Sequence, residues 1–168
     1  MAKTVQTAIL FTTALCFFSL IGIVQCRDAH FFVEGQVYCD PCRAQFMTRL
    51  SEFMPGAKVR LECRANEGGQ LTYSIEGVTD KSGTYSLPVE GEHEEDICEI
   101  LLVKSGKPEC SESGPKGWQR EAARITLTVN SGIASEVRHA NPLGFLTKEA
   151  KPECSEVFKE LNMIPPEI

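Results

Sequence analysis

The sequence lacks most of the features by which enzymes and nucleic-acid-binding proteins are recognised. It contains three histidines and one tryptophan in 168 residues, and it has no G-x-S-x-G segment that would expose a nucleophilic serine. Lysine and arginine total 17 against 23 acidic residues, which gives a net charge of -6. Because a negative chain without a basic stripe is repelled by phosphate groups, we expect no nucleic-acid partner. We also predict no cofactor, no metal ion and no enzymatic activity.

Long apolar runs are absent after the N-terminal segment. Residues 9–24 are almost wholly apolar and follow the basic Lys3, and the chain turns polar directly after Cys26. This layout predicts a secretory signal peptide, residues 1–26, because the run is shorter than the roughly 20 apolar residues of a membrane anchor. We therefore expect a secreted protein with one mature domain, residues 27–168, and no membrane span in the mature form.

Cysteine is the residue type that the sequence has in excess, with eight in total. Removal of the signal peptide leaves six, an even number that implies three disulfides in an oxidising compartment. Six cysteines allow 15 pairings, and their number alone does not choose among them. The six are Cys39, Cys42, Cys63, Cys98, Cys110 and Cys154.

Most of the mature chain alternates apolar and polar residues with a period of two, which is typical of strands with one wet face. Glycine, proline and asparagine separate these runs at roughly ten-residue spacing, a pattern that predicts an all-β antiparallel sandwich or barrel. The expected strands cover residues 31–38, 58–64, 71–78, 85–89, 97–103 and 125–129, with weaker candidates at 136–139 and 143–146.

Three local departures from alternation lead to separate predictions. Gly77 interrupts the apolar phase before Val78, so we expect a bulge or bend there. Apolar residues at helical spacing predict a short turn or helix over residues 42–53 and a second helix over residues 154–161. We expect the second helix to dock on the barrel through Cys154.

The segment Cys39-Asp-Pro-Cys42 admits more than one function. A C-x-x-C pair is the redox motif of thioredoxin-like enzymes, but the surrounding β pattern favours structural disulfides to distant cysteines. A zinc site is the remaining alternative, and the sequence has no second C-x-x-C or H-x(3–5)-H pair to complete it.

Acidic residues crowd around His93. They suggest a weak calcium patch or an acidic docking face, although the oxygen-ligand spacing of an EF-hand is missing. We favour a solvated hairpin loop in which like charges repel. Trp118 is either an exposed recognition residue or part of the core edge, and no N-glycosylation sequon is present. The acidic residues are Glu90, Glu92, Glu94, Glu95, Asp96 and Glu99.

Several segments of the chain resemble the Ole e I-like family of secreted plant proteins, and together they cover essentially the whole mature chain. The six cysteines also follow the family's order. The segments are residues 34–43 (EGQVYCDPCR), 56–63 (GAKVRLEC), 78–85 (VTDKSGTY), 96–99 (DICE) and 141–145 (NPLGF), together with Cys154.

The resemblance implies a seven-stranded antiparallel β-barrel or sandwich akin to transthyretin-like domains. It also implies the disulfides Cys39–Cys110, Cys42–Cys154 and Cys63–Cys98, which would make the C-x-x-C segment structural. Many members of the family carry an N-glycan, and the missing sequon is a departure from that pattern.

For function, the resemblance implies a monomeric, non-enzymatic protein of the apoplast or cell wall that presents loops to a receptor or a cell-wall component. The implied setting is pollen-tube growth, hydration or tissue development, and the protein is a potential allergen. We expect the contact loops at residues 91–96 and 111–119, since loops on a rigid scaffold commonly carry recognition. A secreted hydrolase inhibitor is the alternative, and a redox enzyme using Cys39 and Cys42 is a weaker one.

Overall fold

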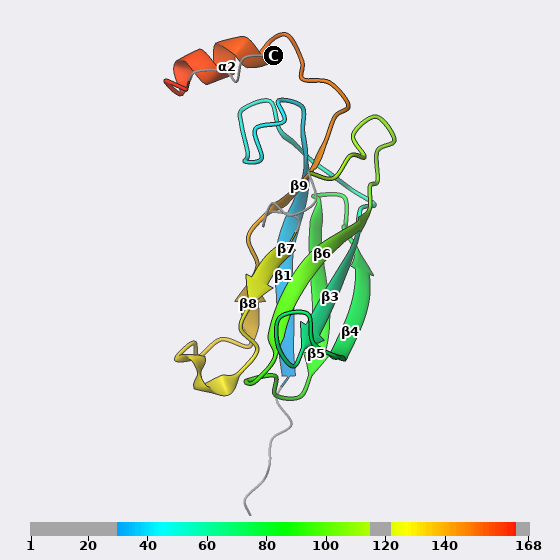
Figure 1. The fold of residues 1–168 in the computed structure, drawn as a ribbon, viewed down its shortest axis with the longest axis vertical. Helices are drawn as coiled ribbons and strands as arrows, with labels where there is room; N and C mark the ends of the chain where they lie inside the picture. Colours follow the sequence, from blue (N-terminus) through cyan, green and yellow to red (C-terminus); the bar gives the residue numbers. More distant parts are fainter. Residues whose placement is uncertain (1–29, 115–121, 164–168) are drawn as a thin grey trace, which may run out of the picture.

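The computed structural model describes residues 30–114 and 122–163, which fold into two facing β-sheets and a short helix (Figure 1). The strands are β1 (His30–Asp40), β2 (Glu52–Phe53), β3 (Lys58–Arg64), β4 (Leu71–Val78), β5 (Thr84–Glu90), β6 (Ile97–Lys104), β7 (Ala122–Ile125), β8 (Val137–His139) and β9 (Leu143–Leu146). A single 3-10 turn, η1 (Val129–Ser131), precedes β8, and the helix is α2 (Cys154–Glu160).

The long strand β1 organises the first sheet. Its first half lies between β5 and β8, and its second half lies between β2 and β9. The pairings with β2 and β5 are antiparallel, whereas β8 and β9 both run parallel to β1. The prediction of a wholly antiparallel fold is therefore wrong. Parallel neighbours need a long crossover, and here the chain passes through the whole second sheet and η1 before it returns beside β1 as β8 and β9.

The second sheet is antiparallel and has the order β4-β3-β6-β7. Register shifts occur in the pairings of β3, between Lys58 and Val59 and between Cys63 and Arg64. The bulge predicted at Gly77 is not there, because Gly77 keeps its place opposite Val59 in a regular ladder. A side chain at this position would overlap with the Leu87 side chain of the facing sheet. Gly77 thus occupies an inward-facing position of β4 and leaves room there for the Leu87 side chain.

The core lies between the two sheets and is built from the inward-facing members of the alternating runs. Leu61 and Ile100 are fully buried in one sheet, and Val33 and Leu87 face them from the other at 2% exposure or less. Each such side chain stabilises the fold by about 1.5–3 kcal/mol relative to its exposed form. The mostly-β prediction is confirmed. The seven-stranded barrel is not, because the described residues form nine strands in two sheets that do not close into a barrel.

Helix α2 matches the prediction for residues 154–161, although it does not pack on a sheet face. It lies beyond the end of the sheets beside the segment that follows β1 (Figure 1). The Lys151 N–H donates to the Pro41 carbonyl at 3.0 Å, and Arg49 pairs with Glu160 at 2.9 Å. Among the described residues, no helix has the length and apolar character needed to cross a bilayer.

For residues 42–53 the sequence predicts a short turn or a helix, and the structure has turns and no helix. The segment consists of turns and bends and ends in the two-residue strand β2. Arg43 and Gln45 both have positive φ angles, of 54° and 62°. A right-handed helix requires negative φ at every position, so none can include Arg43 or Gln45.

Candidate functional site

Three disulfides tie distant parts of the chain together. They join Cys39 to Cys110, Cys42 to Cys154 and Cys63 to Cys98, with Cα separations of 5.9, 5.3 and 4.0 Å. These are the pairs that the family resemblance implies. Because Cys39 and Cys42 bond to different distant partners, the C-x-x-C segment is a pair of structural anchors in this fold.

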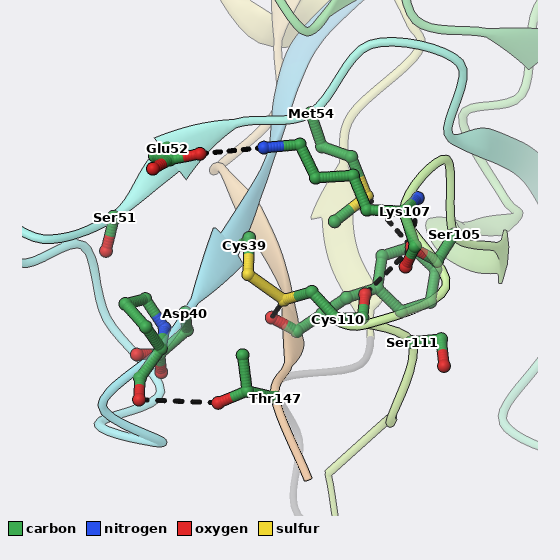
Figure 2. The surroundings of a disulfide bond; sticks show 12 residues. Cys39, Asp40, Ser51, Glu52, Met54, Ser105, Lys107, Cys110, Ser111 and Thr147 are labelled. Carbon is green, nitrogen blue, oxygen red and sulfur yellow. Dashed lines mark hydrogen bonds and ion pairs between the residues drawn. A yellow bond between two sulfur atoms is a disulfide. The ribbon is translucent and has the colours of Figure 1, made fainter. Parts of the chain in front are cut away.

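Hydrogen bonds and an ion pair surround the Cys39–Cys110 bridge (Figure 2). The Ser105 hydroxyl is 2.8 Å from the Cys110 carbonyl, and Lys107 pairs with Glu52 at 2.7 Å. Met54 packs beside the bridge and has no exposed surface. This arrangement fixes the loop after β6 to the end of β1.

The Asp40 carboxylate holds the tight loop between the two bridged cysteines. It is fully buried and accepts the backbone N–H of Cys42 at 3.0 Å and that of Gln45 at 2.7 Å. Burial raises the pKa of Asp40, and the backbone N–H donors of residues 42–45 oppose that rise. The carboxylate thereby stabilises a loop whose two positive-φ residues are strained.

Arg43 connects this loop to two other segments. Its guanidinium pairs with Glu112 at 3.0 Å and also donates to the Thr147 carbonyl. Glu112 exchanges two backbone hydrogen bonds with Leu146 of β9, at 3.0 and 2.7 Å. The loop after β1, the segment around Glu112 and β9 therefore form one connected unit.

A groove of about 530 Å³ opens at this doubly bridged end of the molecule. Apolar side chains dominate its lining, and none of the described residues that line it is charged. Met47, on its rim, is 41% exposed. The apolar lining side chains include Phe46, Met47, Leu102, Leu143 and Leu146.

Two segments that carry the family resemblance meet in this groove. Tyr38 of β1 pairs with Gly144 of β9, and a Cβ on Gly144 would lie 2.7 Å from the Tyr38 ring. The absence of a side chain at Gly144 therefore lets the Tyr38 ring lie close to the β9 backbone. Asn141 and Ser113 add polar groups to the lining, and Ser113 belongs to the predicted contact loop at residues 111–119.

The acidic loop at residues 91–96 lies at the other end of the molecule, where Glu90 pairs with His30 at the start of β1. It connects β5 of one sheet to β6 of the other, so the predicted hairpin is wrong. Glu92 accepts the Val129 N–H at 3.0 Å, and Glu94 accepts the Asn130 side-chain amide at 2.8 Å. These carboxylates anchor the loop to η1 instead of converging on a cation.

His93 is the most enclosed residue of this acidic loop. Its Nδ1 lies 3.0 Å from Asp96, and its ring packs against Tyr73 at a centroid distance of 4.9 Å. The pKa of Asp96 is lowered by the hydrogen bond from Thr72 and then by that from His93. The sequence placed His93 among acids but carried no signal that its ring lies next to the Cys63–Cys98 bridge.

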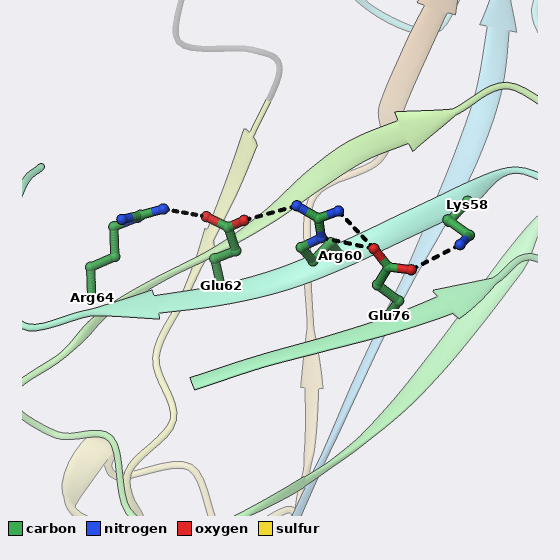
Figure 3. A network of polar contacts seen from close by, with 5 residues as sticks. All are labelled: Lys58, Arg60, Glu62, Arg64 and Glu76. Atoms are coloured by element: carbon green, nitrogen blue, oxygen red, sulfur yellow. Dashed lines mark hydrogen bonds and ion pairs between the residues drawn. The ribbon is translucent and has the colours of Figure 1, made fainter. Parts of the chain in front are cut away.

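A charge ladder runs across the outer face of the second sheet (Figure 3). Glu76 pairs with Lys58 at 2.8 Å and with Arg60 at 2.7 Å, and Glu62 pairs with Arg60 at 3.2 Å and with Arg64 at 2.7 Å. The pKa of Glu62 is lowered mainly by the hydrogen bond from Arg64, and that of Glu76 mainly by the hydrogen bond from Lys58. Glu62 and Glu76 thus each have two basic neighbours.

Some sequence predictions fall outside the described residues. Trp118, together with most of the 111–119 contact loop, lies in the segment 115–121, and the predicted signal peptide lies within residues 1–29. These predictions stay as they were made. The groove itself was missed, because its walls come from segments about 100 residues apart whose pairing the sequence does not show.

The fold and its bridges define a disulfide-linked, two-sheet β-sandwich, and known proteins share it. A family model described as "Pollen protein Ole e 1 like" matches residues 29–162. The chain is 54% identical to the Olee1-like protein of Betula pendula, over 100% of this chain and 99% of the relative. It is 52% identical to pollen allergen Che a 1 of Chenopodium album, over 97% of this chain and 96% of the relative.

The crystal structure of the major plantain pollen allergen Pla l 1 matches with a TM-score of 0.66 and 41% identity, over 75% of this chain and 100% of that chain. The chain belongs to the Ole e 1-like family of pollen proteins, as the sequence motifs predict. The names of these relatives describe allergens and an Ole e 1-like protein, and none of them states an enzymatic activity.

Proposed function

We propose that this chain is a secreted, non-enzymatic recognition protein whose groove binds an apolar segment of an extracellular protein, such as a receptor ectodomain. The observation that carries the proposal is the uncharged groove of about 530 Å³ at the doubly bridged end. Its volume lies within the range of known binding pockets, which combine an apolar lining with a few polar groups.

Disulfides and hydrogen bonds hold the walls of the groove in place in the unbound protein. Cys39 and Cys42 are each bonded to a distant segment, and Asp40 holds the strained loop between them. A preordered surface loses less conformational entropy on binding than a flexible one. Part of the affinity can therefore come from the preorganisation of the loop.

The lining favours a protein segment over an acidic wall polysaccharide. A carboxylate-rich polymer would need basic side chains, and the described residues of the lining include none. The chain as a whole carries a net charge of -6, which also repels such a polymer. Aliphatic and aromatic side chains of a partner would instead bury apolar area against Phe46 and Met47.

We also propose that this recognition occurs in the pollen setting. Several relatives are named as pollen allergens, and we extend to this chain a role in pollen-tube growth or hydration together with allergenic potential. The extracellular space, including the cell wall, is the proposed location. Three disulfides support it, because such bridges persist in oxidising compartments.

Selection of random short peptides displayed on phage tests this proposal. We expect selected peptides to be rich in Phe, Leu and Trp, and we expect Met47→Lys to weaken their binding at least about tenfold by burying a charge. The matched control is Val78→Lys, which places the same charge on an exposed valine of β4, 59% exposed and away from the groove.

Either of two results would contradict the proposal. One is equal binding by the Met47→Lys and Val78→Lys variants. The other is a panel of wall oligosaccharides that binds in a Met47-dependent way while no peptide does, which would assign the groove to the cell wall.

A further inference from the structure

A second cluster of reactive groups lies at the opposite end of the sandwich from the groove. The sulfur atoms of Cys63 and Cys98 and a ring nitrogen of His93 all lie within 4.8 Å of one another. In the part of the chain that the structure describes, no other group of three histidine, cysteine or acidic donors is as close. The cysteines face each other directly on β3 and β6, near the end of the sheet.

The imidazole of His93 is buried and only half satisfied. Its side chain is 10% exposed, and its buried Nε2 atom has no hydrogen-bond partner. On the other side of the ring, Nδ1 lies 3.0 Å from Asp96. Because Asp96 already engages Nδ1, Nε2 is the ring nitrogen that is left to bind a further group. A buried polar atom without a hydrogen-bond partner needs an explanation.

We propose that reduction of the Cys63–Cys98 bridge converts this cluster into a zinc site, with Cys63 Sγ, Cys98 Sγ and His93 Nε2 as ligands. In the oxidised protein the two sulfurs are bonded to each other, and the site is closed to the metal. The end of the sheet therefore alternates between a covalent bridge and a metal bridge, depending on the redox state.

The conversion balances with a thiol reductant. Two thiols give up two electrons and two protons and become one disulfide, while the Cys63–Cys98 bond breaks and yields two cysteine thiols. Zn²⁺ then displaces one proton from each thiol, because thiolates are the ligands it binds. The imidazole of His93 binds the metal through the lone pair of Nε2, and any proton on that nitrogen passes to water.

The surrounding geometry suits zinc. Two thiolates and one imidazole form a ligand set that zinc prefers, and tetrahedral zinc holds two sulfurs about 3.8 Å apart. The three donor atoms already lie within 4.8 Å, so small side-chain rotations bring them into position. Asp96 orients the imidazole through Nδ1, as carboxylates do for metal-bound histidines. Thr72 in turn donates to Asp96 at 2.7 Å.

The experiment maps which thiols zinc protects. The purified protein is reduced with a phosphine without oxygen, zinc is added, and the thiols are alkylated with a maleimide and located by peptide mapping. We expect zinc to slow the alkylation of Cys63 and Cys98 at least about tenfold and to leave the other thiols unprotected. Cobalt in place of zinc should give thiolate-to-metal absorption, and the oxidised protein should bind neither metal.

Two variants connect the protection to the proposed ligands. His93→Phe keeps a ring against Tyr73 and removes Nε2, and we expect it to weaken zinc binding at least about tenfold. Asp96→Asn should weaken zinc binding about 10- to 100-fold, because it disturbs the orientation of the imidazole. His139→Phe is the matched control, because His139 is an exposed histidine on β8, and it should bind zinc like the parent protein.

Each other outcome overturns the proposal. Protection of Cys39 and Cys42 would assign the metal to the C-x-x-C segment, and equal binding by His93→Phe would exclude the imidazole as a ligand. Far-UV circular dichroism shows whether the reduced protein keeps its sheets. If it unfolds and zinc does not restore the β spectrum, the site does not exist.

Discussion

The two ends of the sandwich are held together in different ways. Where β1 ends, two disulfides and the fully hydrogen-bonded carboxylate of Asp40 lock a strained loop and keep a groove open. Where β1 begins, a single bridge joins two neighbouring strands, and a buried imidazole beside it has one nitrogen without a partner. The first end thus combines a hydrogen-bonded buried carboxylate with an open apolar groove, whereas the second leaves a buried ring nitrogen without a partner.

This difference teaches where each end can be changed without loss of the fold. The groove end depends on long-range covalent closure, because its segments are far apart in the sequence. At the other end, Cys63 and Cys98 are already held opposite each other by the β3–β6 ladder. We therefore expect the groove end to respond more strongly to the loss of its bridges than the His93 end.

Removal of single bridges tests this comparison and has the largest expected effect. Cys42→Ala/Cys154→Ala opens a loop with a sequence separation of 112 residues, and Cys63→Ala/Cys98→Ala opens one of 35. Chain entropy predicts losses of about 5 and about 4 kcal/mol of unfolding free energy. Urea denaturation measures both. A larger loss from the Cys63/Cys98 pair would break the comparison.

The buried carboxylate of the groove end comes next. Asp40→Ala leaves the N–H groups of Cys42 and Gln45 without acceptors, and we expect a loss of about 2–3 kcal/mol of unfolding free energy. The folded pKa of Asp40 is raised, so its contribution is fully present below the unfolded pKa of about 3.9 and declines as pH rises through the folded value. The destabilisation should therefore be larger in acid than at neutral pH. If the difference in unfolding free energy between the two proteins did not depend on pH, burial would not shift the pKa of Asp40.

The close approach of β1 and β9 gives a smaller, local prediction. Gly144→Ala pushes a methyl group into the Tyr38 ring, and we expect overpacking to cost about 1–3 kcal/mol and to weaken peptide binding in the groove. Gly114→Ala is the matched control, since a Cβ there meets no atom within 4 Å. It should remain within about 0.5 kcal/mol of the parent protein. Thermal denaturation measures the stability of both variants. Equal stability losses would contradict the prediction and would mean that the Tyr38 ring moves freely aside.

The charge ladder between the two ends gives the smallest expected effect. Glu62→Gln should cost up to about 1 kcal/mol at neutral pH, because both ion pairs lie at the surface. The folded pKa of Glu62 is lowered, so its contribution is present above the unfolded value of about 4.3 and is lost as pH falls through the folded value. The two proteins should become equally stable in acid, opposite to the trend for Asp40. Chemical denaturation across this pH range measures both stabilities. A stability difference that grows in acid would contradict the prediction.

Local patterns in the sequence predicted most of the strands, although the strand expected at residues 125–129 is wrong, because β7 ends at Ile125 and η1 begins at Val129. The alternation in residues 58–64 and 85–89 corresponds to β3 and β5, because a half-buried strand needs one apolar face. The apolar spacing after Cys154 likewise predicted α2. These features depend on neighbouring residues alone, so they can be predicted from the local sequence.

Features that depend on distant partners were not predictable in the same way. Residues 137–139 and 143–146 read as strands, but nothing local indicates that they run parallel to β1. Gly77 looked like a break because the reason for it, Leu87, comes from the other sheet. Apolar spacing over residues 42–53 left a short turn and a helix open, and the structure has turns because Asp40 stabilises positive φ angles within that segment.

The sequence by itself determined which side chains face the core, how many cysteines remain to pair after cleavage of the predicted signal peptide, and the family to which the chain belongs. Only the tertiary structure decided that Tyr38 meets Gly144 across a groove and that His93 lies against the Cys63–Cys98 bridge. The physical reason is the range of the interactions. Periodicity expresses burial one residue at a time, whereas strand partners are chosen by the summed free energy of contacts between segments far apart in the chain.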